Sequence, residues 1–287
     1  NKMRVILLGY TSSIGISILE QLSKKHNLSI VCVGRNIVKK PYINNKIKYL
    51  KWNFIDFSPA RLRFLKEADT IINCIGKIPG KKGSFFNINF YFVKHLVDTI
   101  LKFKKRVHFI QLSSASVFGA NKKYLLKKIS IKESFTTEPN NLYALSKLKA
   151  DTYLKKTAFK NNKYFSYTIL RITNVVGLKN ESNLFSFLQF FLKYNLNFNY
   201  NSQVLYNFIH VRDVAQAVLL TLSNFNISKN KIYIVSNDEL YTEIYKSYSK
   251  LQKFIRIKIW LPKFFLKFIF LFFSYQSKIA KFFFAIS

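Results

Sequence analysis

Short apolar runs alternate with amphipathic stretches through the first 172 residues of the chain. Runs rich in Val, Ile and Leu predict buried strands at Arg4–Leu8, Leu28–Val33, Lys48–Trp52, Thr70–Ile75, Val107–Leu112 and Tyr167–Ile172. Apolar residues at helical spacing predict helices between them, at Ile14–Ser23, Ile88–Phe103 and Leu142–Lys160. Strands that alternate with helices in this way pair in parallel and are covered on both faces. We therefore expect an α/β fold with a doubly wound parallel sheet.

The alternation weakens after Ile172. Three further elements are predicted there: helices at Leu184–Tyr194 and Val211–Leu222, and a strand at Lys231–Val235. Because no long Gly-, Ser- or Pro-rich linker is visible, two domains would be interleaved rather than tethered. We expect an α/β domain at 1–172 and a smaller, mostly helical part at 173–287, of which about 203–236 returns to the first domain.

Composition excludes several classes of protein. With 49% hydrophobic and 17% aromatic residues among 287, the chain can bury a sizeable core and is not disordered. Two cysteines, Cys32 and Cys74, cannot staple a chain of this length, and their apolar surroundings indicate reduced thiols. The first apolar run ends at Gly9, too early for a secretory signal. We therefore expect a cytoplasmic protein.

The net charge of +34 would attract nucleic acid or an anionic membrane. Arg, the residue best suited to bidentate recognition of phosphate or guanine, is only a small part of the 47 basic residues. The lysines accompany Asn, Ile, Phe and Tyr along the whole chain, and no element carries a basic stripe. This pattern is typical of a compositional drift, so nucleic-acid binding is not favoured.

The first motif with a chemical meaning runs from Gly9 to Gly15, directly after the first predicted strand and at the start of a helix. Glycines at such a turn let the backbone approach a pyrophosphate, which binds the free N–H groups of the helix start. An ordinary strand-to-helix turn is the alternative. The position after the first strand of an α/β chain favours the dinucleotide.

A second motif pairs Tyr143 with Lys147, which share one face of a helix. An ammonium beside a phenol stabilises the phenolate and lowers the tyrosine pKa toward neutrality. Such pairs are common on surfaces, so the meaning of this one depends on the serine-rich run Gln111–Gly119, which follows a predicted strand. A hydroxyl at that edge of the sheet and the Tyr/Lys pair can meet over one substrate.

Together these motifs resemble the extended short-chain dehydrogenase/reductase family, in its branch of NAD(P)-dependent nucleotide-sugar epimerases and dehydratases. The resemblance covers nearly the whole chain and includes four more landmarks: Ala68–Asn73, Asn89, Leu170–Gly177 and Phe208–Ala215. It implies a Rossmann-type dinucleotide-binding domain at 1–172 and a substrate-binding part at 173–287. No metal site is expected.

The resemblance also implies roles for individual residues. Tyr143 would be the catalytic acid/base, and Lys147 would bind the nicotinamide ribose and lower the Tyr143 pKa. Ser114, rather than Ser113 or Ser116, would hydrogen-bond the substrate hydroxyl. Asn174 would contact the substrate's phosphate, and Asp213 is expected to be a helix N-cap. The residues that would line the dinucleotide are Gly9, Thr11, Ser12, Ser13, Ile14, Gly15, Arg35, Asn53, Phe54, Cys74, Ile75, Gly76, Asn89 and Lys147.

Three positions depart from the family's pattern. Ser12 replaces the middle glycine of the fingerprint, which predicts weakened or altered cofactor binding, although its hydroxyl could donate to phosphate. Gly34 stands where NAD-preferring members carry an acid, and Arg35 beside it suits a 2′-phosphate, so NADP is favoured over NAD. Tyr206-Asn207 stands where many members have the Arg-Asp that grips a diphosphate, which weakens the case for a nucleotide substrate.

The favoured function is hydride transfer by an NAD(P)-dependent epimerase, dehydratase or reductase on a nucleotide-activated sugar, for a surface polysaccharide. One alternative is a reductase of a small carbonyl substrate, which needs Ser114, Tyr143 and Lys147 but no diphosphate site. Another is a catalytically idle dinucleotide-binding regulator, which the intact Ser, Tyr and Lys disfavour and Ser12 favours. A homodimer is left open.

The segment Trp260–Ser287 differs in kind, with an aromatic run too short to span a membrane. On a helix, one narrow arc would hold Lys263, Lys267, Ser274, Lys278 and Lys281, and Phe and Leu would fill most of the rest. Such a face fits packing on the protein's own core, a subunit interface or an anionic membrane surface. Our hypothesis is peripheral association with the inner face of the membrane.

Overall fold

The computed structural model describes residues 2–38, 47–58, 60–79, 84–119, 131–177, 196–197, 205–240 and 257–258. The chain divides into two compact units, Asn1–Thr173 with Val211–Val235 and Asn174–His210 with Ser236–Ser287. The first unit contains the large sheet and every motif residue that precedes Asn174. Which unit binds a dinucleotide and which a substrate stays a prediction at this point.

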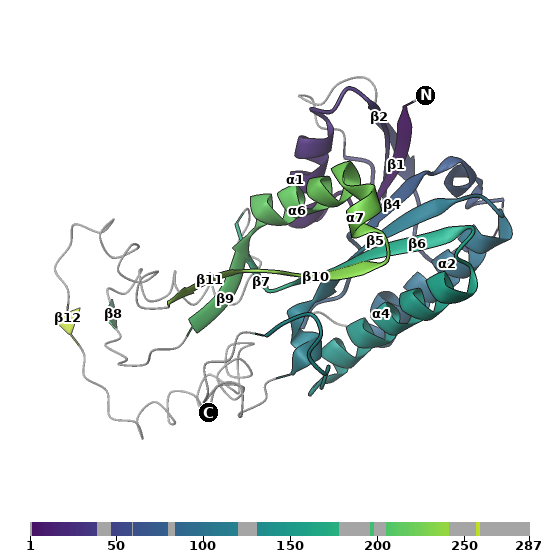
Figure 1. Ribbon diagram of the computed structural model, residues 1–287. Coiled ribbons are helices and arrows are strands. Elements are labelled where there is room, and N and C mark those ends of the chain that lie inside the picture. The colour runs from purple at the N-terminus through teal and green to yellow at the C-terminus, as the bar shows by residue number, and fades with distance from the viewer. Residues whose placement is uncertain are drawn as a thin grey trace. The chain divides into compact units, whose positions relative to one another are not determined.

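Seven strands form the sheet of the first unit, in the order β10-β6-β5-β4-β1-β2-β3 (Figure 1). They are β1 (Met3–Leu8), β2 (Leu28–Gly34), β3 (Ile47–Lys51), β4 (Thr70–Asn73), β5 (Val107–Ser114), β6 (Phe165–Ile172) and β10 (Lys231–Val235). All neighbouring pairs are parallel, which confirms the predicted doubly wound sheet. The order reverses between β1 and β4, and ligands of open α/β sheets bind at the carboxyl ends of strands beside such a reversal.

Helices cover both faces of this sheet (Figure 1). On one face α1 (Ser13–Leu22) packs against α6 (Val211–Ser223), and on the other α2 (Phe92–Lys102) packs against α4 (Leu142–Lys160). A π-helical segment, Asn87–Tyr91, leads into α2, and the short α7 (Phe225–Ser228) precedes β10. No helix in the described ranges is long and apolar enough to cross a membrane.

The predicted ends of α4 and β10 are confirmed, and most other elements begin or end one or two residues from their predicted bounds. Two of the differences have a clear physical reason. β4 ends at Asn73 rather than Ile75, because the Asn73 Oδ1 accepts a hydrogen bond from the Ile75 N–H (3.0 Å) and turns the chain out of the sheet. Asp213 is not an N-cap, because α6 already begins at Val211. The carboxylate therefore lies inside the first helical turn, where it still favours the positive end of the helix dipole.

In the second unit, β9 (Leu205–His210) runs parallel to β7 (Asn174–Val176) and antiparallel to β11 (Asn237–Leu240). A short parallel pair joins β8 (Leu196–Asn197) to β12 (Ile257–Lys258). The helix predicted at Leu184–Tyr194 and the segment Trp260–Ser287 lie outside the described residues. The mostly helical character of this part stays a prediction.

An aromatic cluster fixes the chain after β3. Trp52 is 1% exposed, and its ring contacts those of Phe54, Phe57, Phe64 and Phe92 at centroid distances of 5.0–6.2 Å. Its indole N–H donates to the Asp56 carbonyl (2.9 Å). Because Phe92 belongs to α2, the cluster binds the loop after β3 to that helix and so shapes this edge of the sheet.

A buried histidine joins β5 to β6. His108 is 3% exposed, with Nδ1 2.9 Å from the Ser166 hydroxyl and Nε2 3.0 Å from the Thr168 hydroxyl. The Thr168 hydroxyl donates its one hydrogen to the Ser228 carbonyl (2.8 Å), so it must accept from His108. The His108 Nε2 therefore carries a hydrogen. Burial, together with the Lys229 charge, lowers the pKa of His108 to about 4.

We expect His108 to destabilise the fold as the pH falls. Below its unfolded pKa of ~6.5 the unfolded chain binds a proton that the folded chain rejects. Stability is therefore lost as the pH falls from about 6.5 to the folded pKa of about 4. At ~1.4 kcal/mol per pKa unit, the loss is on the order of 3 kcal/mol.

Urea unfolding gives the free energy of unfolding of the wild type and of His108→Gln at several pH values between 7.5 and 4. The loss due to His108 is the amount by which this free energy falls more steeply with decreasing pH in the wild type than in the variant. His26→Gln, at an exposed histidine, is the control and should keep the wild-type slope. A wild-type slope in His108→Gln would contradict the prediction.

Candidate active site

Ser114 is the last residue of β5 and caps the 3₁₀ turn Ala115–Phe118. Its Oγ accepts hydrogen bonds from the Ser116 N–H (3.2 Å) and the Ser116 hydroxyl (2.9 Å). A serine hydroxyl has two acceptor positions and one hydrogen. Both acceptor positions are used by Ser116, so the hydrogen of Ser114 is left for another partner. Ser114 also lies close enough to Tyr143 to lower the pKa of its phenol. Ser116, which the sequence interpretation set aside, therefore orients Ser114.

Tyr143 lies in the first turn of α4, whose N-cap is Asn141 with its Oδ1 2.9 Å from the Ala144 N–H. Burial raises the pKa of the Tyr143 phenol, and the nearby Ser114 hydroxyl opposes this shift. Lys147 is not among the causes of the shift, because its ammonium donates to the Leu112 carbonyl. The expectation that Lys147 lowers the Tyr143 pKa stays a prediction.

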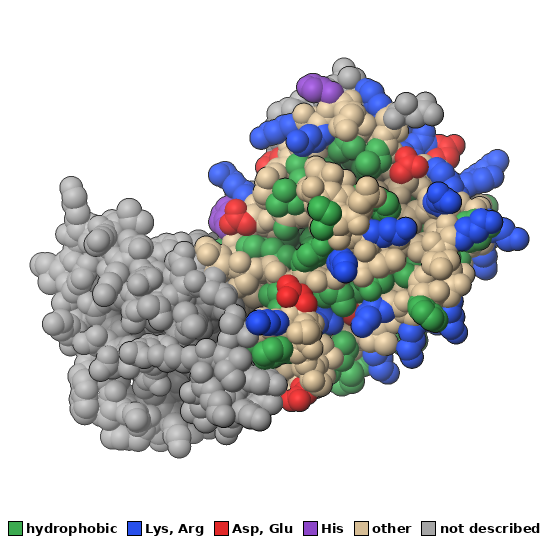
Figure 2. All heavy atoms as spheres, viewed as in Figure 1, with side chains coloured by type: hydrophobic (Ala, Val, Ile, Leu, Met, Phe, Trp, Pro, Cys, Tyr) green, Lys and Arg blue, Asp and Glu red, His purple; other side chains and the backbone are tan. Residues whose placement is uncertain are grey.

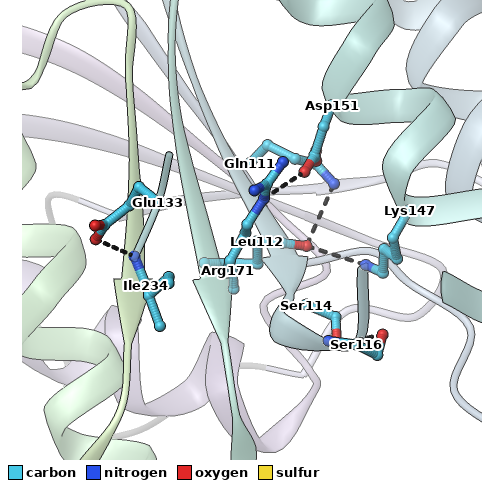
Figure 3. A network of polar contacts seen from close by, with 9 residues as sticks. All are labelled: Gln111, Leu112, Ser114, Ser116, Glu133, Lys147, Asp151, Arg171 and Ile234. Carbon is cyan, nitrogen blue, oxygen red and sulfur yellow. Dashed lines mark hydrogen bonds and ion pairs between the residues drawn. The ribbon is translucent and has the colours of Figure 1, made fainter. Parts of the chain in front are cut away.

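Lys147 is buried one turn further along α4, and its Nζ donates to the Leu112 carbonyl (3.0 Å; Figure 3). The last pair between β4 and β5 is Asn73 with Gln111, so Leu112 lies just beyond the end of β4. Its carbonyl is therefore available to side chains, and the Gln111 amide also donates to it (3.3 Å). Burial lowers the pKa of Lys147 to about 8, and the Asp151 charge opposes this shift.

A buried ion pair lies behind Lys147. The Arg171 Nε of β6 is 3.2 Å from the Asp151 Oδ2 of α4, and both side chains are at most 5% exposed (Figure 3). The Arg171 guanidinium also lies 5.0 Å from the centroid of the Phe118 ring. Burial raises the pKa of the Asp151 carboxyl, and the guanidinium opposes this shift. Sequence reasoning missed Asp151, although its spacing of four from Lys147 places both on one helix face.

Asn89, in the π-helical segment, binds the loop after β4 to α4. Its Oδ1 accepts from the Lys77 N–H (2.7 Å), and its amide donates to the Lys77 carbonyl (3.1 Å) and to the Ser146 hydroxyl (3.0 Å). The Ser146 hydroxyl in turn donates to the Tyr143 carbonyl (2.7 Å). Both amide hydrogens of Asn89 are thus used within the chain, so Asn89 fixes the loop after β4 next to α4.

The turn between β1 and α1 is closed by its own residues. Gly9 has a φ of +74°, and a Cβ on Gly15 would lie 2.4 Å from the Gly9 carbonyl oxygen. The Ser12 hydroxyl donates to that same carbonyl (2.9 Å) and accepts from the Gly15 N–H (3.0 Å). The single hydrogen of Ser12, which was expected to be available for phosphate, is therefore directed at Gly9.

Tyr10 explains the missing acid at the end of β2. A Cβ on Gly34 would lie 2.8 Å from the Tyr10 ring, which is 1% exposed. The Tyr10 hydroxyl accepts from the Val38 N–H (2.7 Å) and donates to the Asn36 carbonyl (3.3 Å), so the ring cannot swing aside. Arg35 next to this contact is exposed. A large aromatic residue within a glycine-rich turn was the signal in the sequence.

The remaining predicted cofactor residues lie at the same edge of the sheet. A Cβ on Gly9 would be 3.0 Å from the Ile75 side chain, and one on Gly76 would be 3.0 Å from the Lys147 Nζ, so the loops after β1 and β4 and helix α4 converge. Cys74 is a free thiol whose pKa is raised by burial. Beside β3, the Asn53 Oδ1 accepts from the Ile55 N–H (3.1 Å).

Two predicted features belong to the second unit. Asn174 begins β7, and Tyr206-Asn207 lies on β9 opposite β11. In the described ranges of the chain, no group of three or more His, Cys, Asp or Glu side chains could hold a metal ion.

Solved structures similar to this chain are sugar-nucleotide epimerases. UDP-glucuronic acid 4-epimerase from Bacillus cereus, in complex with NAD, has 15% identity and a TM-score of 0.72 over 90% of this chain and 87% of that chain. UDP-Glc/GlcNAc 4-epimerase from Campylobacter jejuni has 18% identity and a TM-score of 0.74, covering 91% and 88%. UDP-N-acetylglucosamine 4-epimerase from Methanobrevibacter ruminantium, in complex with UDP-N-acetylmuramic acid, has 19% identity and a TM-score of 0.71, covering 90% and 84%.

At these identities the solved structures establish the fold alone. No curated protein matches the chain in sequence. The sequence pattern of the NAD dependent epimerase/dehydratase family, however, matches residues 5–236. That range takes in the turn after β1, the end of β5, the Tyr/Lys pair of α4 and the strand β9. The chain belongs to the NAD dependent epimerase/dehydratase family.

Proposed function

We propose that this enzyme acts on a nucleotide-activated sugar, with Tyr143 as the acid/base for a sugar hydroxyl. The observation that carries the proposal is the meeting of Ser114, Tyr143 and Lys147 at the carboxyl end of β5. The similar solved structures are named as epimerases of UDP-sugars, and one of them holds a UDP-sugar. A catalytically idle module is not favoured, because Ser114, Tyr143 and Lys147 are all present and buried or half-buried at one edge of the sheet.

In this proposal, residues of the chain accept and donate the proton of the sugar hydroxyl. The substrate hydroxyl would replace Ser114 or join it as a partner of the Tyr143 oxygen. With Tyr143 ionised, its phenolate would take the proton of that hydroxyl as the carbon is oxidised. The nicotinamide, when bound, supplies the hydride chemistry. Lys147 would bind the ribose beside it, and the Leu112 carbonyl together with the Asp151–Arg171 pair would keep the ammonium in place.

The turn after β1 and the loop after β4 fit a dinucleotide. Glycine at 15 lets the turn close on the Gly9 carbonyl, and glycine at 76 leaves space for the Lys147 ammonium. Among the described residues, none accepts a hydrogen bond from the N–H of Ser13 or Ile14, so both can bind a phosphate at the start of α1. The residues proposed to line the cofactor are Gly9, Thr11, Ser12, Ser13, Ile14, Gly15, Arg35, Asn53, Phe54, Cys74, Ile75, Gly76, Asn89 and Lys147. We propose NADP as the preferred form, because Arg35 follows β2 where no carboxylate is present.

Contact with a membrane and formation of a homodimer are proposals from the sequence alone. Residues 260–287, which would carry the membrane contact, lie outside the described residues. On the face shown in Figure 2, Lys and Arg side chains of the described part are scattered among apolar and acidic ones. The net charge of +34 would assist such a contact by a general electrostatic attraction.

Tyr143→Phe tests the catalytic assignment. We expect turnover to fall by ~10²–10⁴-fold, because the variant keeps the ring and loses the proton-transfer group. Turnover of a UDP-hexose and the Kd for NAD(P) are the two measurements, and the Kd should stay unchanged. Tyr164→Phe, at the amino end of β6, is the matched control and should turn over normally. Normal turnover in Tyr143→Phe would remove Tyr143 from the mechanism.

Ser12→Gly tests the cofactor turn. Losing the hydroxyl frees the Gly15 N–H for phosphate, so we expect NAD(P) to bind about three- to tenfold more tightly, as one hydrogen bond contributes ~0.5–1.5 kcal/mol. The helix cap is lost at a cost of only a few tenths of a kcal/mol, whereas Ser12→Ala should cost ~1 kcal/mol. Calorimetric titration and urea unfolding measure the two effects. Weaker binding by Ser12→Gly would show that the hydroxyl itself contacts the cofactor.

Arg35→Asp tests the cofactor preference. A hydrogen bond to a charged group contributes ~1.5–3 kcal/mol, so we expect the ratio of NADP to NAD affinity to fall at least about tenfold. The Kd of each dinucleotide is measured for the wild type, for Arg35→Asp and for Arg63→Asp, a control with the same change of charge at another exposed arginine. If the ratio of NADP to NAD affinity changes equally in Arg35→Asp and Arg63→Asp, the change in net charge explains the effect and Arg35 does not contact the cofactor.

A further inference from the structure

Lys77 carries a buried charge that the proposed chemistry does not use. It follows Gly76 in the loop after β4, and only 4% of it is exposed. Its Nζ is buried and has no hydrogen-bond partner in the part of the chain that the structure describes. The Phe85 ring, with its centroid 5.7 Å from the Nζ, offsets the lost hydration only in part. An unpaired ammonium is costly to bury, so packing alone does not explain why a lysine stands here.

The position of Lys77 is set by the same contacts that set Tyr143. Asn89 holds the backbone of Lys77 on both sides, at its N–H and at its carbonyl, and binds it to Ser146 of α4. The Phe85 ring, which faces the Lys77 ammonium, makes an edge contact with the Tyr143 ring at a centroid distance of 5.8 Å. One aromatic ring therefore contacts both the unpaired cation and the candidate catalytic phenol.

The lysine-rich composition does not account for this residue either. Lys149 makes the same kind of contact with the next phenylalanine, its Nζ lying 5.3 Å from the centroid of Phe86. Lys149, however, is exposed, which is the ordinary place for a lysine gained by drift. Lys77 and Lys149 thus share a cation–ring contact and differ in burial.

We propose that Lys77 is an anion-binding residue of the active site, whose ammonium pairs with an anionic oxygen group of the substrate. This inference rests on the proposed function and extends it. A nucleotide-activated sugar carries two anionic oxygen groups of this kind: its diphosphate and, where the sugar is a uronic acid, the carboxylate of the sugar. Both accept charge-assisted hydrogen bonds from an ammonium. The ligand supplies the partner that the unliganded protein lacks, so the cost of the buried charge is recovered on binding.

The test compares Lys77→Met and Lys77→Arg with Lys149→Met as the matched control. Kd values for UDP, UDP-glucose and UDP-glucuronic acid are measured by calorimetric titration in the presence of NAD, and melting temperatures without a UDP ligand. We expect Lys77→Met to bind at least about tenfold more weakly and to melt no lower than the wild type, because its side chain fills the same space without the charge. Lys77→Arg and Lys149→Met should keep most of the affinity. A loss for UDP-glucuronic acid alone identifies the carboxylate, and a loss for all three ligands identifies the diphosphate.

Wild-type affinity of Lys77→Met for all three ligands would overturn the inference, as would a lower melting temperature with unchanged binding. Turnover of the same UDP-sugars separates this result from the proposed function. If the wild type binds them with a dependence on Lys77 but converts none with NAD or NADP, the proposed function fails and the anion site stands. If Lys77→Met converts and binds them like the wild type, only the inference on Lys77 fails.

Discussion

The early end of β4 is the constraint on which the site depends. The Asn73 side chain turns the chain away from the sheet after four residues, opposite Gln111 of β5. β5 continues, so the Leu112 carbonyl on that side has no strand partner and accepts the Lys147 ammonium instead. The chain that leaves β4 provides Gly76, which gives the ammonium room, and then the backbone that Asn89 holds. The early end of β4 thus provides the carbonyl that binds the Lys147 ammonium and also the loop that lies beside it.

The sheet and its helices could be predicted because their signals are local. The apolar run of β10 and the helical spacing of α4 each specify one element, and both were found with the correct ends. Boundaries that depend on one side chain were harder. The end of β4 rests on an asparagine amide that reaches the backbone two residues on, and a run of apolar residues gives no sign of it.

The sequence named candidate residues for the site and not the connections between them. Tyr143 and Lys147 were named from a motif, and Ser114 from the resemblance to the family, but the direction of the Lys147 ammonium depends on where a neighbouring strand stops. Ser116 and Asp151 act through other residues, so neither forms a motif of its own. The raised pKa of Tyr143 reflects burial, which the spacing of two residues along a helix does not report.

The contact between Tyr10 and Gly34 links two positions that are far apart in the sequence. Any Cβ at position 34 would meet the Tyr10 ring, which the backbone of Asn36 and Val38 holds in place. The two positions are therefore interdependent: an acid can replace Gly34 only together with a smaller residue at position 10. The exposed Arg35 beside them makes no part of this contact, so a change of charge at this end of β2 can be made there by one substitution.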